Sequence, residues 1–178
     1  MNEKAKIDSV KCSSCMHCRS VCSRIGAKAI SITWRPDHKQ APWFVENALG
    51  VVKSIGAEKF YYVNLAIDIS DKCDCWNVGP ALLVHDIGIF GSRDPVAVDQ
   101  ACLDAVNRAE PNPESVVSKV ERGGDKFAVA HDSKDPKTGK MLHLAEIQLE
   151  HAEKMKLGKR DYELVTLTKA RPEGYSEN

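Results

Sequence analysis

The sequence lacks a net charge. Lysine and arginine together number 25, and aspartate and glutamate also number 25. A chain without an excess of positive charge has no uniform basic surface with which to hold a nucleic acid backbone. The chain also lacks the Gly-x-Gly-x-x-Gly and Walker patterns that cradle phosphates. Nucleic acid binding and a nucleotide site are therefore not expected.

Long apolar runs are missing as well. No stretch reaches the ~20 residues needed to cross a bilayer, and residues 1–6 are polar, unlike a secretion signal. These absences predict a cytoplasmic protein that has no membrane partner. Cysteine, in contrast, is abundant, with seven in the chain and four of them within residues 12–22. Cysteines this close rarely reach disulfide geometry without strain, so metal ligation in a reducing compartment explains them better.

The four clustered cysteines have the spacing Cys12-x-x-Cys15-x-x-Cys18-x-x-x-Cys22. Bacterial ferredoxins hold an iron–sulfur cluster with this run. Such spacing lets a tight loop surround one cluster while backbone N–H groups point at its sulfides. Zinc is the alternative, because Cys-x-x-Cys is half of many zinc sites, but those sites join two pairs across a longer loop. The spacing predicts a [4Fe–4S] cluster held by Cys12, Cys15, Cys18 and Cys22.

The run departs from the ferredoxin pattern in two ways. Ser23 stands where a proline normally follows the last cysteine. Only one run is present, whereas in two-cluster ferredoxins the fourth cysteine ligates the other cluster and is expected to start a helix that leads it away. The fourth ligand is therefore either Cys22 in altered geometry or a group from elsewhere, with Cys73, Cys75 and a partner chain as candidates. His17 lies inside the run, but a loop histidine more often faces solvent.

The chain length suffices for a small cluster-binding segment joined to one compact domain. Residues 34–42 contain two prolines and no apolar periodicity, which is typical of a linker with a turn. The predicted organisation is a ferredoxin-like iron–sulfur segment at 1–35, a compact α/β (or α+β) domain at 41–168 and a disordered tail at 169–178.

Apolar periodicity predicts the elements of the second domain. Residues 59–69 are rich in aromatic and β-branched residues and are expected to form a central, buried strand. Asp94 as N-cap and Pro95 at the first helical position predict a helix that runs to about Arg108. The expected helices are 41–55, 95–108, 114–121 and 142–158, and the expected strands are 59–69, 82–90 and 162–168.

A second group of cysteines follows the predicted central strand. Cys73 and Cys75 lie on one side of an extended segment, just beyond the strand end where open α/β sheets carry their sites. Two interpretations are equally open: the pair binds metal or lies near the cluster, or it forms two half-buried thiols beside Trp76. Cys102, on the helix that follows Pro95, is expected to belong to the core.

Aspartates are dense around the same strand ends. Two or three that converge can hold a divalent cation or act as an acid–base pair. For any one of them, capping a helix or solvating a loop is the expectation. The residues concerned are Asp68, Asp71, Asp74, Asp86, Asp94 and Asp99.

Four blocks of the sequence carry a resemblance to a known family. They are, in chain order, VNLAIDISDKCDCW, HDIGIFGSRDPVAVDQACLD, GGDKF and LEHAEKMKLGKRDYEL. From the cysteine run to Leu164, the chain resembles the carboxyl-terminal half of the domain of unknown function 362 family, often described as iron–sulfur or ferredoxin-like proteins. Its members usually carry a long α/β portion before the ferredoxin segment and commonly two cysteine runs. The resemblance implies a truncated gene, a degenerate paralogue or a split subunit whose amino-terminal half is a separate chain, and it supplies no reaction.

Together these patterns predict a cytoplasmic iron–sulfur protein that transfers electrons to a redox partner protein. Two alternatives stay open. The chain is a redox or lyase-type enzyme whose second Asp/Cys site at the strand ends binds substrate, or its cluster is a structural staple only.

Overall fold

The computed structural model describes residues 7–8, 10–13, 15–27, 29–30, 37–72, 79–135 and 137–167. The chain divides into two compact units, Met1–Arg35 and Pro36–Asn178. Among the described residues of the first unit, helix α1 (His17–Arg24) is the one regular element. The second unit, called the body below, contains all the other helices and both strands.

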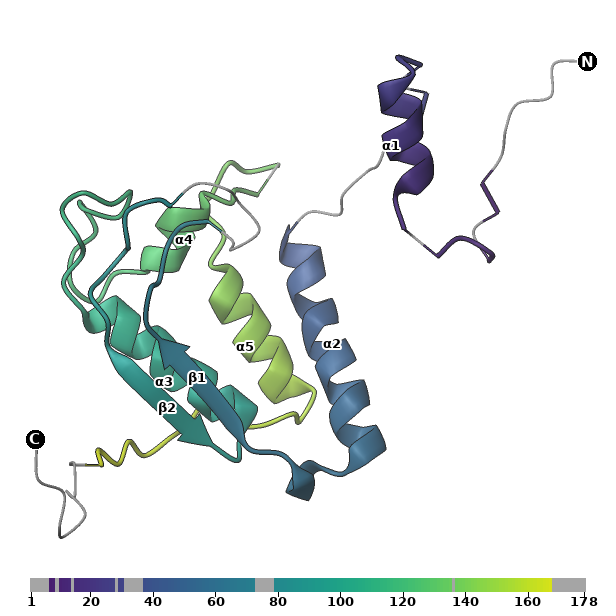
Figure 1. Ribbon diagram of the computed structural model, residues 1–178. Helices are drawn as coiled ribbons and strands as arrows, with labels where there is room; N and C mark the ends of the chain where they lie inside the picture. Colours follow the sequence, from purple (N-terminus) through teal and green to yellow (C-terminus); the bar gives the residue numbers. More distant parts are fainter. Residues whose placement is uncertain are drawn as a thin grey trace, which may run out of the picture. The chain divides into compact units, whose positions relative to one another are not determined.

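The body packs a small sheet against one face of a helix (Figure 1). Strands β1 (Tyr62–Ala66) and β2 (Gly88–Ser92) pair antiparallel, with Tyr62 opposite Ser92 and Ala66 opposite Gly88. The sheet lies on α3, and α5 packs against α2, α3 and α4. The bounds of these elements are α2 (Asp37–Ile55), η1 (Ala57–Lys59), α3 (Pro95–Arg108), α4 (Lys126–His131) and α5 (Leu144–Lys154).

This arrangement confirms the mixed α/β class, with five α-helices and one two-stranded antiparallel sheet in the described part of the chain. The ferredoxin-like form of the first unit stays a prediction. No helix among the described residues is long and apolar enough to span a bilayer.

Two groups of buried side chains form the core, and α3 contributes to both. The first joins α2, α3 and α5 and contains Val45, Val96, Leu103, Leu149 and Ala152. The second lies toward the other end of α3 and contains Leu83, Val84, Val106 and Val117. Burial of these aliphatic side chains is the main force that holds the body together.

The start of α3 is as the sequence predicted. One oxygen of the Asp94 carboxylate accepts hydrogen bonds from the N–H groups of Val96 and Ala97, at 2.8 and 3.0 Å. Pro95 occupies the first turn, where a missing N–H has no cost. The other carboxylate oxygen accepts a bond from the backbone N–H of Lys159 at 2.8 Å. The cap therefore also ties the segment after α5 to the start of α3.

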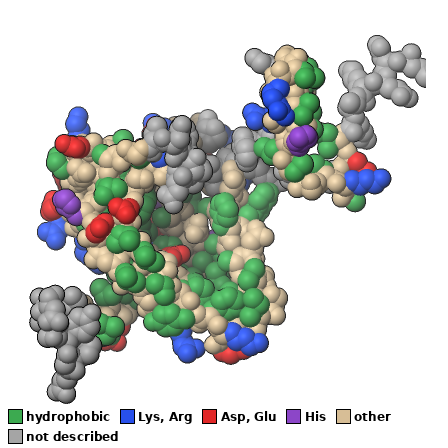
Figure 2. Space-filling view, viewed as in Figure 1, with side chains coloured by type: hydrophobic (Ala, Val, Ile, Leu, Met, Phe, Trp, Pro, Cys, Tyr) green, Lys and Arg blue, Asp and Glu red, His purple; other side chains and the backbone are tan. Residues whose placement is uncertain are grey.

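The prediction of a central strand at 59–69 is wrong. The strand has five residues, and its side chains alternate between α3 and solvent, leaving Val63 53% and Leu65 58% exposed. Only one strand, β2, pairs with it among the described residues, and only α3 covers a face of the sheet. Hydrophobic side chains consequently remain on the surface of the body (Figure 2).

Three other element predictions also need correction. Helix α2 begins at Asp37, inside the predicted linker, and accommodates Pro42 in its second turn. Residues 114–121 form successive turns in place of a helix. The described residues of the expected last strand, 162–167, pair with no strand. Leu164 and Val165 there are more than half exposed, so their alternation has no buried face behind it.

Lys126 is the most buried charged side chain described, with an exposed fraction of 0%. Its Nζ donates a hydrogen bond of 2.6 Å to the carbonyl oxygen of Asn107, near the end of α3. Burial lowers the pKa of this ammonium group below its ordinary value, because desolvation disfavours the charged form.

This lowered pKa predicts a stability that rises in alkaline solution. Between the folded-state pKa of Lys126 and its higher value in the unfolded chain, the unfolded chain binds the extra proton, so the free energy of unfolding increases with pH. Lys126→Met removes this contribution. Urea unfolding of both proteins between neutral pH and about pH 10 should show the difference in stability moving in favour of the wild type as pH rises. Parallel curves would contradict the assignment.

Candidate functional site

The second half of the cysteine run lies on α1. The helix begins at His17, after Met16 adopts a left-handed conformation with φ 63°. Cys18 is therefore in the first turn and Cys22 in the second, four residues apart and on one face of the helix. The expectation that Cys22 starts a helix is wrong, since the helix begins five residues earlier.

The four thiols differ in their exposure. Cys12, Cys15 and Cys18 are exposed, whereas Cys22 is only 8% exposed. The Cys22 sulfur accepts a hydrogen bond of 3.1 Å from the backbone N–H of Ala29. Three thiols are thus open to an incoming group, and the fourth is held by the chain itself.

Local hydrogen bonds favour the thiolate form of Cys15. The backbone N–H of His17, and to a lesser extent the side chain of Ser13, lower the pKa of the Cys15 thiol. Donors aimed at a sulfur atom stabilise its negative charge. Since a metal is bound by the thiolate and not by the thiol, this is the electrostatic setting that a thiolate ligand needs. The His17 side chain is itself exposed, as expected for a loop histidine, although it belongs to α1.

The described residues do not converge on one point. Within that part of the chain, no group of three or more histidine, cysteine or acidic side chains is close enough to hold a metal ion. The donor set nevertheless fits a thiolate-bound group in its chemistry: four soft sulfur donors in a short stretch, three of them accessible and one biased toward thiolate.

The second predicted site is only partly within the described residues. Cys73, Asp74 and Cys75 lie outside them. Asp71 forms an ion pair of 2.8 Å with Lys72, and Asp86 accepts a bond from the backbone N–H of Asp68 at 3.0 Å. Because β1 and β2 are antiparallel, the end of one strand meets the start of the other, so they do not present two carboxyl ends at one edge. The described aspartates form no common metal site.

Asp99 and Cys102 instead line a cavity in the body. Asp99 accepts a hydrogen bond of 2.7 Å from the side-chain amide of Asn64 on β1. Cys102, one turn later on α3, is half-buried rather than packed in the core as predicted. The spacing of three residues on a predicted helix was a signal that the two share a face, but only the fold shows that this face borders open space.

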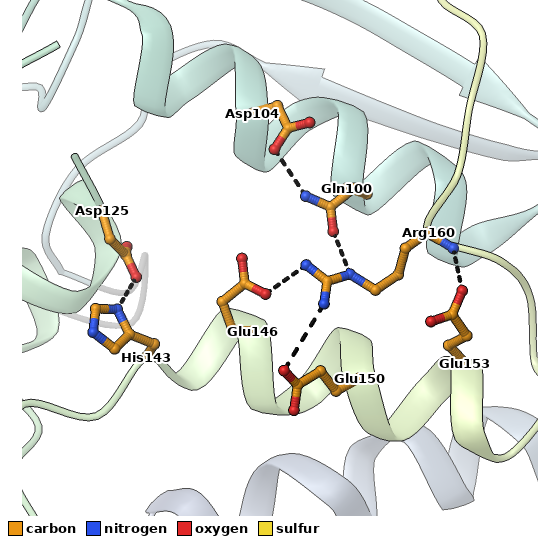
Figure 3. A network of polar contacts seen from close by, with 8 residues as sticks. All are labelled: Gln100, Asp104, Asp125, His143, Glu146, Glu150, Glu153 and Arg160. Atoms are coloured by element: carbon orange, nitrogen blue, oxygen red, sulfur yellow. Dashed lines mark hydrogen bonds and ion pairs between the residues drawn. The ribbon is translucent and has the colours of Figure 1, made fainter. Parts of the chain in front are cut away.

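A polar network that the sequence did not predict connects α3 with α5 (Figure 3). The guanidinium group of Arg160 donates to the side chains of Gln100 on α3, at 2.7 Å, and of Glu146 on α5. Its backbone N–H donates to Glu153 at 3.0 Å, and Gln100 donates in turn to Asp104 at 2.8 Å. Gln100 is buried and Arg160 is half-buried, and hydrogen bonds satisfy both side chains. The network therefore has a structural role: it joins α3 to α5 and to the segment after α5.

Comparisons with known proteins add no assignment. No protein-family model matches the chain, and no curated protein and no solved structure was found to match it. The resemblance described from the sequence blocks thus stays a prediction.

Proposed function

We propose that residues 12–22 hold a [4Fe–4S] cluster and that the chain serves as an electron-transfer protein. The observation that carries the proposal is the set of three exposed thiols, Cys12, Cys15 and Cys18, at the ferredoxin spacing. Hydrogen bonds from His17 and Ser13 lower the pKa of the second of them, Cys15. When bound, the cluster supplies a centre that gains and loses one electron at a time.

The residues of the first unit support this role in two ways. The exposed thiols lie in a short segment that a partner protein can approach, which short-range electron transfer requires. Helix α1 begins without a side-chain cap at Met16, and backbone N–H groups in the first turn of a helix stabilise negative charge on neighbouring sulfur atoms. The partner in this proposal is a redox protein that exchanges electrons with the cluster.

A potentiometric titration tests the proposed function. Anaerobically purified protein is poised at a series of potentials, and the electron paramagnetic resonance signal is recorded at each. We expect a reversible one-electron couple within the range of iron–sulfur proteins, about −700 to +450 mV. A protein that contains iron and sulfide but shows no reversible couple has a structural cluster, and the electron-transfer role would be rejected.

We predict that the fourth ligand comes from outside the run. The Cys22 sulfur belongs to the one buried residue of the four, 8% exposed, so it is the least accessible of the four thiols. Cys73 and Cys75 are the candidates within the chain, and a cysteine of a partner chain is the alternative. If one of the pair ligates, Cys73→Ser or Cys75→Ser should lower the iron content or convert the signal to a three-iron form, and Cys22→Ser should have the smaller effect.

The same three variants can also contradict this prediction. Loss of the cluster in Cys22→Ser, with iron content and spectrum unchanged in both Cys73→Ser and Cys75→Ser as monomers, would make Cys22 the fourth ligand. Iron and acid-labile sulfide, counted per chain, are the measurements in each case.

A further inference from the structure

The cavity beside Asp99 has the size and composition of a small-molecule site. Its volume is about 750 Å³, and it opens between β1, α3, α4 and α5. Ligand sites in proteins usually measure ~300–1,000 Å³, with mostly apolar walls and a few polar groups. The apolar wall is formed by Ile69, Leu103, Val106, Phe127, Leu144 and Leu149.

The charged groups of the cavity leave one carboxylate without a cation. Asp71 and Lys72 pair with each other at 2.8 Å. His131 is engaged through Nδ1 with the Ser133 hydroxyl at 2.9 Å. Asp99 receives only the neutral amide of Asn64, and no lysine, arginine or histidine among the described residues forms an ion pair with it.

The burial of Asp99 makes the lack of a cationic partner energetically unfavourable. Its side chain is partly buried, and burial raises the pKa of the carboxyl group because the charged form loses solvation. An ion with no counter-charge in such surroundings has an unfavourable free energy that a bound cation relieves. Asn64 fixes one carboxylate oxygen, which leaves the other oxygen to accept a hydrogen bond from a ligand.

We propose that this cavity binds a small molecule that carries a primary amine on an apolar body, with Asp99 as its counter-ion. The apolar wall accepts the body of the ligand, and the carboxylate selects the ammonium head over a hydroxyl or a carboxylate. Every described residue that lines the cavity belongs to the body, and none lies in the run Cys12–Cys22.

Isothermal titration calorimetry on the anaerobically purified full chain tests the proposal with three probes of one shape: phenylbutylamine, phenylbutanol and phenylbutanoate. We expect the amine to bind at least about tenfold more tightly than the alcohol, and the carboxylate to bind most weakly. Asp99→Asn should abolish the preference for the amine. Asp161→Asn, which alters an exposed carboxylate outside the cavity, should retain it.

Cys102 provides a readout in the wild-type protein that does not depend on the folding of a variant. Its thiol lines the cavity one turn from Asp99, so a bound amine should slow its alkylation by iodoacetamide. Peptide mapping by mass spectrometry distinguishes Cys102 from the other six cysteines. Equal affinities for the amine and the alcohol, or an unchanged rate of Cys102 alkylation at saturating phenylbutylamine, would overturn the proposal.

Discussion

Replacing Cys15 with alanine should remove nearly all iron and acid-labile sulfide from the anaerobically purified protein and abolish its brown colour. Cys15 is the second of the four cysteines in the run, and it is exposed. The backbone N–H of His17 and the side chain of Ser13 lower the pKa of its thiol. Without Cys15, the loop keeps only the two thiolates of Cys12 and Cys18, and we expect these to be too few to retain the cluster. Elemental analysis and the visible absorption spectrum measure the loss.

Cys102→Ala is the matched control for this experiment. It removes a thiol from the body, outside the run, and should leave the iron and sulfide content unchanged. Stoichiometric zinc without sulfide in the wild-type protein, after strictly anaerobic preparation, would refute the iron–sulfur assignment and favour the zinc alternative.

The second large effect concerns Gly158, which lies against the cap of α3. A Cβ atom added at Gly158 would overlap the Asp94 carboxylate that accepts bonds from Val96, Ala97 and Lys159. Gly158→Ala therefore forces the carboxylate out of its capping position or displaces the backbone. We expect a loss of about 3 kcal/mol in the free energy of unfolding, the sum of an overpacking cost and a lost cap. Urea denaturation measures this loss.

Gly50→Ala is the control, because it makes the same chemical change inside α2. A Cβ at Gly50 has no heavy atom within 4 Å, and alanine has the higher helix propensity. Stability should rise by about 0.5–1 kcal/mol. A double-mutant cycle with Asp94→Ala identifies the cause of the Gly158 effect: the cost of Gly158→Ala should fall sharply once the carboxylate is gone. An undiminished cost would place the clash elsewhere.

Local sequence signals predicted the elements that local interactions build. Asp94 and Pro95 specify the start of α3 through a cap and a preset φ, both of which act within one helical turn. Helix α2 ends at Ile55, the end of the predicted range 41–55, and Gly56 follows with a φ of 105°, a conformation that other residues rarely adopt. Signals of this kind need no knowledge of the rest of the chain.

Apolar patterns in the sequence were less informative about burial, because burial depends on which elements cover a side chain. The apolar run at 59–69 was interpreted as a central strand, yet Val63 and Leu65 face solvent because only α3 covers the sheet. Cys102 was expected in the core, yet it borders a cavity, because α3, α4 and α5 do not close over it. Periodicity shows which residues share a face but not what lies opposite that face.

The sequence by itself determined the spacing of Cys12, Cys15, Cys18 and Cys22, and with it the prediction of an iron–sulfur cluster, since ligand type and spacing are properties of the chain alone. The tertiary structure alone decided which of these thiols are exposed, where α1 begins among them, and that Asn64 and Asp99, 35 positions apart, form a polar pair in the wall of an apolar cavity. The physical reason is the distance along the chain over which each effect acts. Spacing and capping act over a few residues, whereas exposure, desolvation and the pairing of distant side chains depend on which elements pack together.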